Sequence, residues 1–139
     1  MKLLRLGEVS KNDIYIIPQV NYSDVSILWV NDVYDGFISG MAQYQATMLL
    51  FDLIDYDRIG TETDMTRKYW LISLEDTQLE EEVYWHKLFC LNVGSHYDFT
   101  RNYLPVAERD INLDAFYVPY RKRVTPNYQD NIIIGWFEN

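Results

Sequence analysis

The fold of this chain is decided by residues 26–54, which read SILWVNDVYDGFISGMAQYQATMLLFDLI. Apolar and aromatic residues are frequent in 26–34 and in 37–45, and the pair Asp35-Gly36 separates the two runs. An Asp-Gly pair in this place favours a type I′ turn, because both central residues of that turn need a positive φ. Residues 47–54 add a third run that suits a strand. The stretch therefore predicts a three-stranded antiparallel meander.

Further strands are predicted on both sides of this meander. Residues 67–74 carry bulky side chains on both faces, which predicts a central strand. Residues 55–66 are polar and predict a long exposed loop. The remaining predicted strands are Ile14–Ile17, which Pro18 ends, Ala115–Tyr120, and the terminal strand Asn131–Phe137.

A helix is predicted over residues 77–93. Thr77 and Glu80 have the spacing of a capping box at its start, and Gly94 is placed to end it in the left-handed conformation. The helix should bury an apolar stripe at the 3.6-residue period, which Leu88, Phe89 and Leu91 widen. The stripe itself consists of Leu79, Val83, His86, Cys90 and Val93.

These elements predict an α+β fold, in which a mostly antiparallel meander sheet packs against one main helix. We expect residues 1–139 to form a single domain, because a chain of this length fits one domain.

The composition excludes several classes of protein. Aromatic residues make up 16% of the chain, which excludes disorder. The net charge of −9 argues against binding nucleic acid or an anionic membrane. Most of this charge lies in residues 51–100, with 11 acidic and 4 basic side chains. The single Cys fits a reducing compartment, and without a signal peptide or membrane segment we expect a cytoplasmic protein.

One group of residues has the chemistry of a metal site. His86 and Cys90 lie one helical turn apart, and His96 and Asp98 follow the helix. Zinc accepts all three of these types of ligand, although the spacing matches no standard zinc module. The alternative is that Cys90 is a small core residue and that His86 borders the apolar stripe.

Other motifs are weaker. The loop at residues 55–66 places Gly at the sixth position of a calcium loop but lacks the Glu at the twelfth, and a solvated loop is the simpler interpretation. Asp32 and Asp52 are candidates for a carboxylate pair, whereas Asp35 is explained by the turn. The sequence has no nucleotide-binding or hydrolase motif, so we predict no cofactor and assign no catalytic residue.

The chain resembles an uncharacterised family of small bacterial proteins, which have a "DYYDGPLSG"-like hairpin and a "VGxH" helix end. The resemblance rests on residues 32–40, on Phe51-Asp52, on residues 69–74 and on residues 89–96. Phe37 departs from the Pro of that pattern, and Val33 departs from a Tyr. The resemblance implies the order of meander and helix and a bacterial or phage origin. It implies no activity.

The sequence favours a small acidic binding protein, of the immunity or inhibitor type, that masks a basic protein partner such as a toxin or nuclease. Acidic groups accelerate the encounter with a basic surface, and Tyr and Trp side chains supply short-range binding energy. We expect the partner to contact Asp55, Asp57, Glu62, Asp64, Glu80 and Glu81.

Two alternatives stay open at this point. One is a protein or enzyme that binds a small ligand or metal near His86, His96 and Asp98, with Cys90 as a further ligand. The other is a structural domain whose role is to form a homo-oligomer. Since one fold serves many functions, the fold class does not choose among them.

Overall fold

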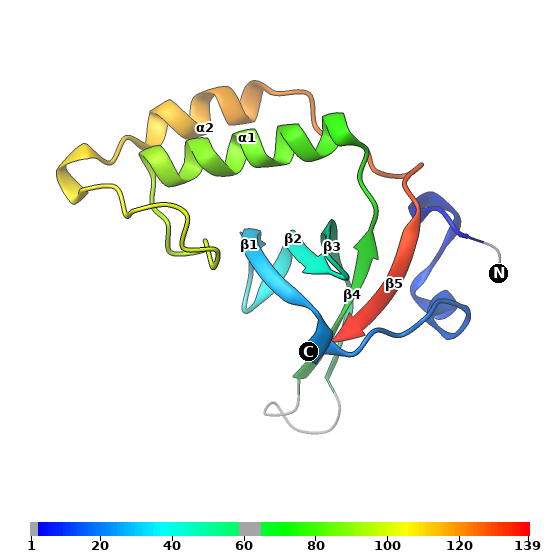
Figure 1. Cartoon of the computed structure of the whole chain (residues 1–139). Helices are drawn as coiled ribbons and strands as arrows, with labels where there is room; N and C mark the ends of the chain where they lie inside the picture. Colours follow the sequence, from blue (N-terminus) through cyan, green and yellow to red (C-terminus); the bar gives the residue numbers. More distant parts are fainter. Residues whose placement is uncertain (1–2, 59–64) are drawn as a thin grey trace. The chain divides into compact units, whose positions relative to one another are not determined.

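The structure is a computed structural model that describes residues 3–58 and 65–139, and the side chains of residues 3–54 and 66–139. It has two compact units (Figure 1). The sheet unit contains the chain up to Leu74 together with Asn127–Asn139, and the helical unit is Glu75–Pro126. The predicted single domain, and the predicted packing of the main helix on the sheet, stay predictions.

The sheet unit is a five-stranded antiparallel sheet in meander order, so the predicted α+β class is confirmed. A sequential order arises when each strand pairs with the next one along the chain. The strands are β1 (Ser26–Val33), β2 (Phe37–Tyr44), β3 (Thr47–Arg58), β4 (Met65–Ile72) and β5 (Ile133–Glu138). Short 3₁₀ helices cover Leu6–Glu8, Lys11–Ile16, Tyr22–Asp24 and, in the helical unit, Glu108–Asp110.

The hairpin between β1 and β2 is confirmed, with a different turn from the one expected. Val33 pairs with Phe37, which leaves a loop of three residues, Tyr34–Gly36. Asp35 and Gly36 both have a positive φ, of 53° and 140°, and the Tyr34 amide donates to the Gly36 carbonyl at 2.9 Å. The Asp-Gly signal therefore located the turn correctly but not its length.

The predicted boundaries of the loop over residues 55–66 are wrong at both ends. The backbone of β3 continues to Arg58 and that of β4 begins at Met65, so that Asp55 pairs with Lys68 and Asp57 with Thr66. A hairpin can extend beyond the core with polar residues, because ladder hydrogen bonds satisfy its backbone without any apolar contact.

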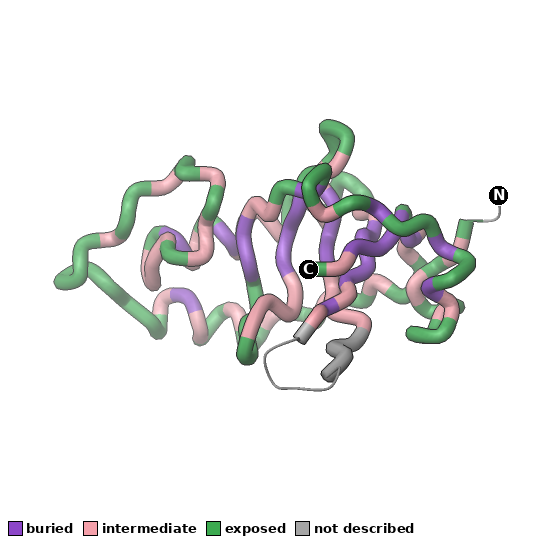
Figure 2. The backbone as a smooth tube through the Cα atoms, turned by 90° about the horizontal axis from the view of Figure 1, so that it is seen from below, coloured by how far each residue is buried: buried purple, intermediate pink, exposed green. Residues whose placement is uncertain are grey.

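The central place of β4 is confirmed. Tyr69, Trp70, Leu71 and Ile72 are all at most 5% exposed, so both faces of this strand are covered. Most of the buried residues lie in the strands, and Figure 2 colours the buried residues purple along the chain. The terminal strand β5 is confirmed as well, and it pairs with β4 at the sheet edge.

The segment before β1 is helical and not extended. We predicted a strand over Ile14–Ile17, and Lys11–Ile16 instead forms a 3₁₀ helix. Its start is held by a capping box, in which the Ser10 side chain accepts from the Asn12 amide and Asp13 accepts from the Ser10 amide at 2.8 Å. The Trp136 indole then donates to two carbonyls of this segment, at 3.0 and 3.1 Å. Capping and this tertiary contact outweigh the strand propensity of the β-branched residues.

The helical unit contains α1 (Asp76–Asn92) and α2 (Leu113–Lys122). The main helix is confirmed, but the details of its ends were predicted wrongly. Glu75 and Gln78 form the capping box, in place of Thr77 and Glu80. Gly94 lacks a positive φ, and its amide donates to the Phe89 carbonyl at 3.2 Å. The last turn therefore closes without a left-handed glycine.

The second helix replaces the predicted strand at Ala115–Tyr120. The Asn112 side chain caps it by accepting from the Ala115 amide at 3.2 Å. Phe116 and Tyr120, one turn apart, then face the aromatic side chains of α1, with the Trp85 ring 5.4 Å from that of Tyr120. Aromatic residues favour strands in isolation, and packing against α1 overrides that preference here.

In the helical unit, α2 runs alongside α1 (Figure 1). Trp85 and Phe89 both contact Phe116, at ring distances of 6.3 and 5.2 Å. His86 and Cys90 follow one position later, and each is buried. Leu91, which was predicted to widen the apolar stripe, is 69% exposed. Among the described residues, no helix is long and apolar enough to cross a membrane.

Candidate metal centre

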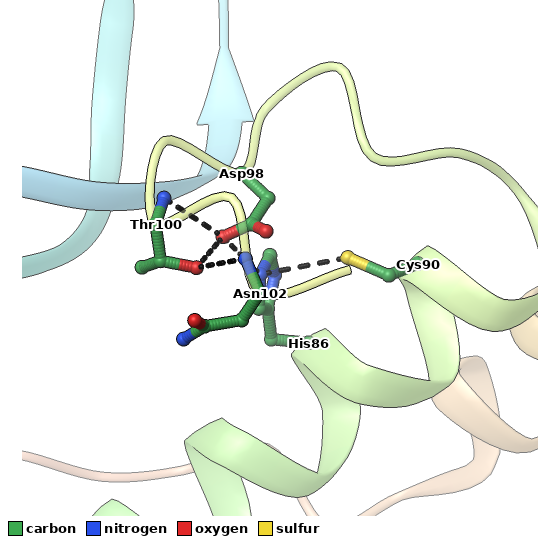
Figure 3. Close-up of polar contacts among 5 residues, drawn as sticks. All are labelled: His86, Cys90, Asp98, Thr100 and Asn102. Carbon is green, nitrogen blue, oxygen red and sulfur yellow. Dashed lines mark hydrogen bonds and ion pairs between the residues drawn. The ribbon is translucent and has the colours of Figure 1, made fainter. Parts of the chain in front are cut away.

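Three side chains with metal-ligating atoms meet in the helical unit (Figure 3). His86 and Cys90 project from successive turns of α1, and Asp98 comes from the segment after this helix. His86 Nε2 lies 3.5 Å from Cys90 Sγ and 3.3 Å from Asp98 Oδ1. One ligand atom from each residue lies within 4.8 Å of the other two.

The cluster is shielded from solvent. The exposed fraction of the side chain is 4% for His86 and 1% for Asp98, and Cys90 is 2% exposed as a residue. Only three residues of the helical unit are classed as buried, and His86 and Cys90 are two of them, beside Phe116. Two of these three buried positions therefore carry atoms that can ligate a metal, although cysteine is also a common core residue.

A short network of hydrogen bonds holds the Asp98 carboxylate (Figure 3). Oδ1 accepts from the Thr100 hydroxyl at 2.6 Å and from the Thr100 amide at 3.3 Å. The Asn102 amide in turn donates to the Thr100 hydroxyl oxygen at 3.2 Å. Oδ2 is buried and has no hydrogen-bond partner among the described residues. A buried carboxylate oxygen in this state is costly unless a further group engages it.

Burial changes the titration of both neighbours of Asp98. It lowers the pKa of His86, and the hydrogen bond and negative charge of Asp98 oppose this effect. Burial, with a smaller contribution from the charge of Asp98, raises the pKa of the Cys90 thiol to about 11. Without a metal, imidazole and thiol are therefore both neutral at pH 7.

The cluster could supply three of the four ligands that a tetrahedral zinc ion takes. In a tetrahedral centre with Zn–S of about 2.3 Å and Zn–N of about 2.1 Å, nitrogen and sulfur ligands lie about 3.5 Å apart. The distance between His86 Nε2 and Cys90 Sγ has this value, 3.5 Å. One thiolate and one carboxylate would also cancel the charge of a divalent ion, as a buried centre requires. Imidazole and thiolate ligands favour zinc over magnesium or calcium.

Tyr103 also belongs to the surroundings of this cluster. Its ring stands edge-to-face against the His86 imidazole, with 5.6 Å between centroids. Burial raises the pKa of Tyr103, and the negative charges of Cys90 and Asp98 add to this rise. The phenol therefore stays protonated beside the cluster at neutral pH.

His96 was predicted to join this group, and the structure does not bring it there. Its side chain is exposed and packs 4.4 Å from the Tyr97 ring and 5.9 Å from Phe89. Thr100, Asn102 and Tyr103 were not predicted to belong to the site. The alternation Asp98-x-Thr100-x-Asn102 is typical of side-chain-to-backbone turns, and this signal could have identified the residues that hold Asp98.

The acidic residues predicted to contact a partner fall in different parts of the chain. Glu80 and Glu81 are exposed on α1. Asp55 and Asp57 belong to β3, within the stretch whose side chains are not described. Glu62 and Asp64 lie outside the described residues. A single acidic surface therefore stays a prediction.

The candidate carboxylate pair lies in the sheet unit. Asp32 and Asp52 both pair with Ser39 of β2, from opposite sides. Burial raises the pKa of Asp52, the Leu53 amide lowers it, and the negative charge of Asp32 raises it further. These residues flank one position of the sheet.

Comparison of the chain with protein-family models, with curated proteins and with solved structures gave no match. The resemblance to a bacterial family therefore stays a prediction, and the geometry of the helical unit is the main guide to function.

Proposed function

We propose that this chain is a metal-binding protein, and that His86, Cys90 and Asp98 form a centre for zinc. One observation carries the proposal: three different ligating side chains converge within 4.8 Å in a buried position. The unpartnered Oδ2 of Asp98 supports it, because a cation supplies the partner that this atom lacks. A purely structural network would explain the contacts of His86 and Cys90 but would leave that oxygen unexplained.

The proposal is tested by adding zinc to the purified full-length chain after treatment with a chelator. We expect one zinc ion per chain by elemental analysis and by competition with a chromophoric chelator. Magnesium or calcium in excess should not displace it, since these ions prefer oxygen ligands. Failure to bind zinc in a stoichiometric amount would contradict the proposal.

The chain offers a matched control, because it has two histidines and the structure places only one in the cluster. His86→Gln and Cys90→Ala should weaken zinc binding by at least about 100-fold, since each removes a ligand and even residues that only support ligands contribute about 10–100-fold. His96→Gln should bind zinc as the unmodified chain does. Equal effects of the two histidine substitutions would place the site elsewhere.

A second function is supported by the exposed acidic side chains at the start of α1. Glu75, Asp76, Glu80 and Glu81 are all exposed within two turns of this helix. We propose that this surface, called the acidic start of α1, binds a basic protein partner. Attraction of this kind accelerates association and weakens with salt.

This second proposal is tested by capture of proteins from a cell lysate at low and high salt. We expect basic proteins to be retained at low salt, and the double substitution Glu80→Lys, Glu81→Lys to abolish their retention. Glu8→Lys with Asp130→Lys makes the same change of charge at exposed positions outside α1 and should leave retention intact. Equal loss in both variants would show that only net charge matters.

A further inference from the structure

The inference concerns Thr100 and rests on the proposed metal centre. Thr100 is the described residue that makes two hydrogen bonds to Asp98, through its hydroxyl at 2.6 Å and its amide at 3.3 Å. Both bonds end on Oδ1, so the two oxygens of the carboxylate are in different states. Oδ1 is held by donors, and Oδ2 is buried with no partner among the described residues.

A hydrogen bond from the Asn102 amide orients the Thr100 hydroxyl. The Asn102 amide donates to the hydroxyl oxygen at 3.2 Å, and this bond occupies one of its lone pairs. The hydroxyl proton is therefore available for Asp98, at a distance typical of a short bond to a charged acceptor. The donors follow one another from the Asn102 amide through Thr100 to Oδ1 (Figure 3).

Metal binding would increase the dependence of Asp98 on Thr100. His86 Nε2 lies 3.3 Å from Oδ1 and can donate a proton to it while the metal is absent. A nitrogen that coordinates a metal uses its lone pair and carries no proton, so this bond to Oδ1 is lost. The two bonds from Thr100 then hold the carboxylate against α1, and Oδ2 keeps its lone pairs for the ion.

We propose that Thr100 is a positioning residue of the metal centre: it holds Oδ1 of Asp98 so that Oδ2 faces the ion. Residues that orient a ligand in this way change metal affinity by about 10–100-fold when they are replaced. The effect arises because a free carboxylate must be ordered when the metal binds, whereas a held one is already in place.

The experiment compares Thr100→Val, which keeps the shape but removes the hydroxyl, with Thr100→Ser, which retains it. We expect Thr100→Val to weaken zinc binding by about 10–100-fold and Thr100→Ser to remain within about threefold of the unmodified chain. Asn102→Ala is the matched control, because Asn102 acts through its backbone amide, which this substitution leaves in place. Its zinc affinity should not change.

Cobalt supplies a readout that a merely structural role would not move. Cobalt(II) bound in place of zinc should show the charge-transfer band of the Cys90 thiolate in every variant, while its ligand-field bands shift in Thr100→Val alone. If Thr100→Val does not fold, Thr100→Ala tests the same loss of the hydroxyl.

The outcomes separate the two proposals. If the unmodified chain binds no zinc, the proposed function fails. If it binds zinc and Thr100→Val or Thr100→Ala binds equally well, the metal centre stands and the role of Thr100 is refuted.

Discussion

A buried arginine of the sheet unit and a buried aspartate of the helical unit differ in how their polar atoms are satisfied. In the sheet unit, Arg67 is 8% exposed, and its guanidinium donates to the carbonyls of Tyr34, Asp35 and Phe37 at 2.7–3.3 Å. In the helical unit, Asp98 is equally hidden, but one of its oxygens has no partner among the described residues. The first arrangement is complete within the chain, and the second is not.

This difference separates a structural group from a candidate functional one. The Arg67 guanidinium donates hydrogen bonds to carbonyls of the loop between β1 and β2, so these bonds stabilise the hairpin. Removal of such a buried donor costs stability, because the carbonyls lose their partner. Asp98 instead combines with a thiol and an imidazole, and its contribution should appear mainly in binding.

The largest expected effect is that of Arg67→Met on the sheet unit. The carbonyls of Tyr34 and Asp35 lose the Arg67 donor, whereas that of Phe37 still accepts from the Tyr69 hydroxyl. This loss should lower the free energy of unfolding by about 2–3 kcal/mol, measured by urea denaturation. Zinc affinity at pH 7 should not change. Arg109→Met is the control, since that side chain is 88% exposed and should cost less than about 0.5 kcal/mol. A loss of zinc binding in Arg67→Met would break the comparison.

Next in size is the effect of Asp98→Asn on the helical unit. The amide keeps the shape of the carboxylate but not its charge, so zinc affinity should fall by about 100-fold. The pKa of the Cys90 thiol should fall below about 11, because the charge of Asp98 is one of its two causes, and burial should keep it above the ordinary value. Thiolate absorbance during a pH titration measures this change. Asp110→Asn replaces an exposed carboxylate of the same unit and should have neither effect.

A third prediction concerns the pH dependence of zinc binding. The Cys90 thiol has a pKa of about 11 and must lose its proton to bind the metal, whereas His86 is already neutral, since its pKa is lowered. Rising pH therefore favours binding, by about tenfold per pH unit between pH 7.5 and 9.5. Competition titrations in this interval measure the slope. A slope of zero would remove Cys90 from the ligands, and His96→Gln should show the same slope as the unmodified chain.

The smallest expected effect is that of Asp52→Asn in the sheet unit. The folded-state pKa of Asp52 is raised, mainly by burial, so folding favours its protonated form. This contribution is present below the unfolded-state pKa and is lost as the pH rises through the folded-state pKa. Asp52→Asn should therefore be more stable than the unmodified chain at pH 7, by less than about 1 kcal/mol, and the difference should shrink below about pH 4. Destabilisation of Asp52→Asn at pH 7 would instead mean that the carboxylate has a favourable partner.

Much of the fold could be predicted because its signals are local. The Asp35-Gly36 pair located the first hairpin, and alternating bulky residues identified β4 as a central strand. The helical period placed His86 and Cys90 on the same face of α1, since residues four apart are neighbours on a helix. Each of these inferences needs only a short window of the chain.

The remaining features depend on contacts between residues that are distant in sequence or separated by irregular backbone. α2 formed where strand propensity was high, because Phe116 and Tyr120 pack against Trp85. The backbone after α1 is irregular, so no periodic pattern in the sequence predicts its path. This path places Asp98 in the cluster and His96 outside it.

The sequence by itself therefore determined the meander, the main helix and the shared helix face of His86 and Cys90. Only the tertiary structure decided that Asp98 meets His86, that Thr100 holds it, and that one carboxylate oxygen is buried with no partner in the described part of the chain. The physical reason is that burial and hydrogen-bond saturation are properties of a group's whole surroundings, and a linear pattern specifies only the neighbours along the chain.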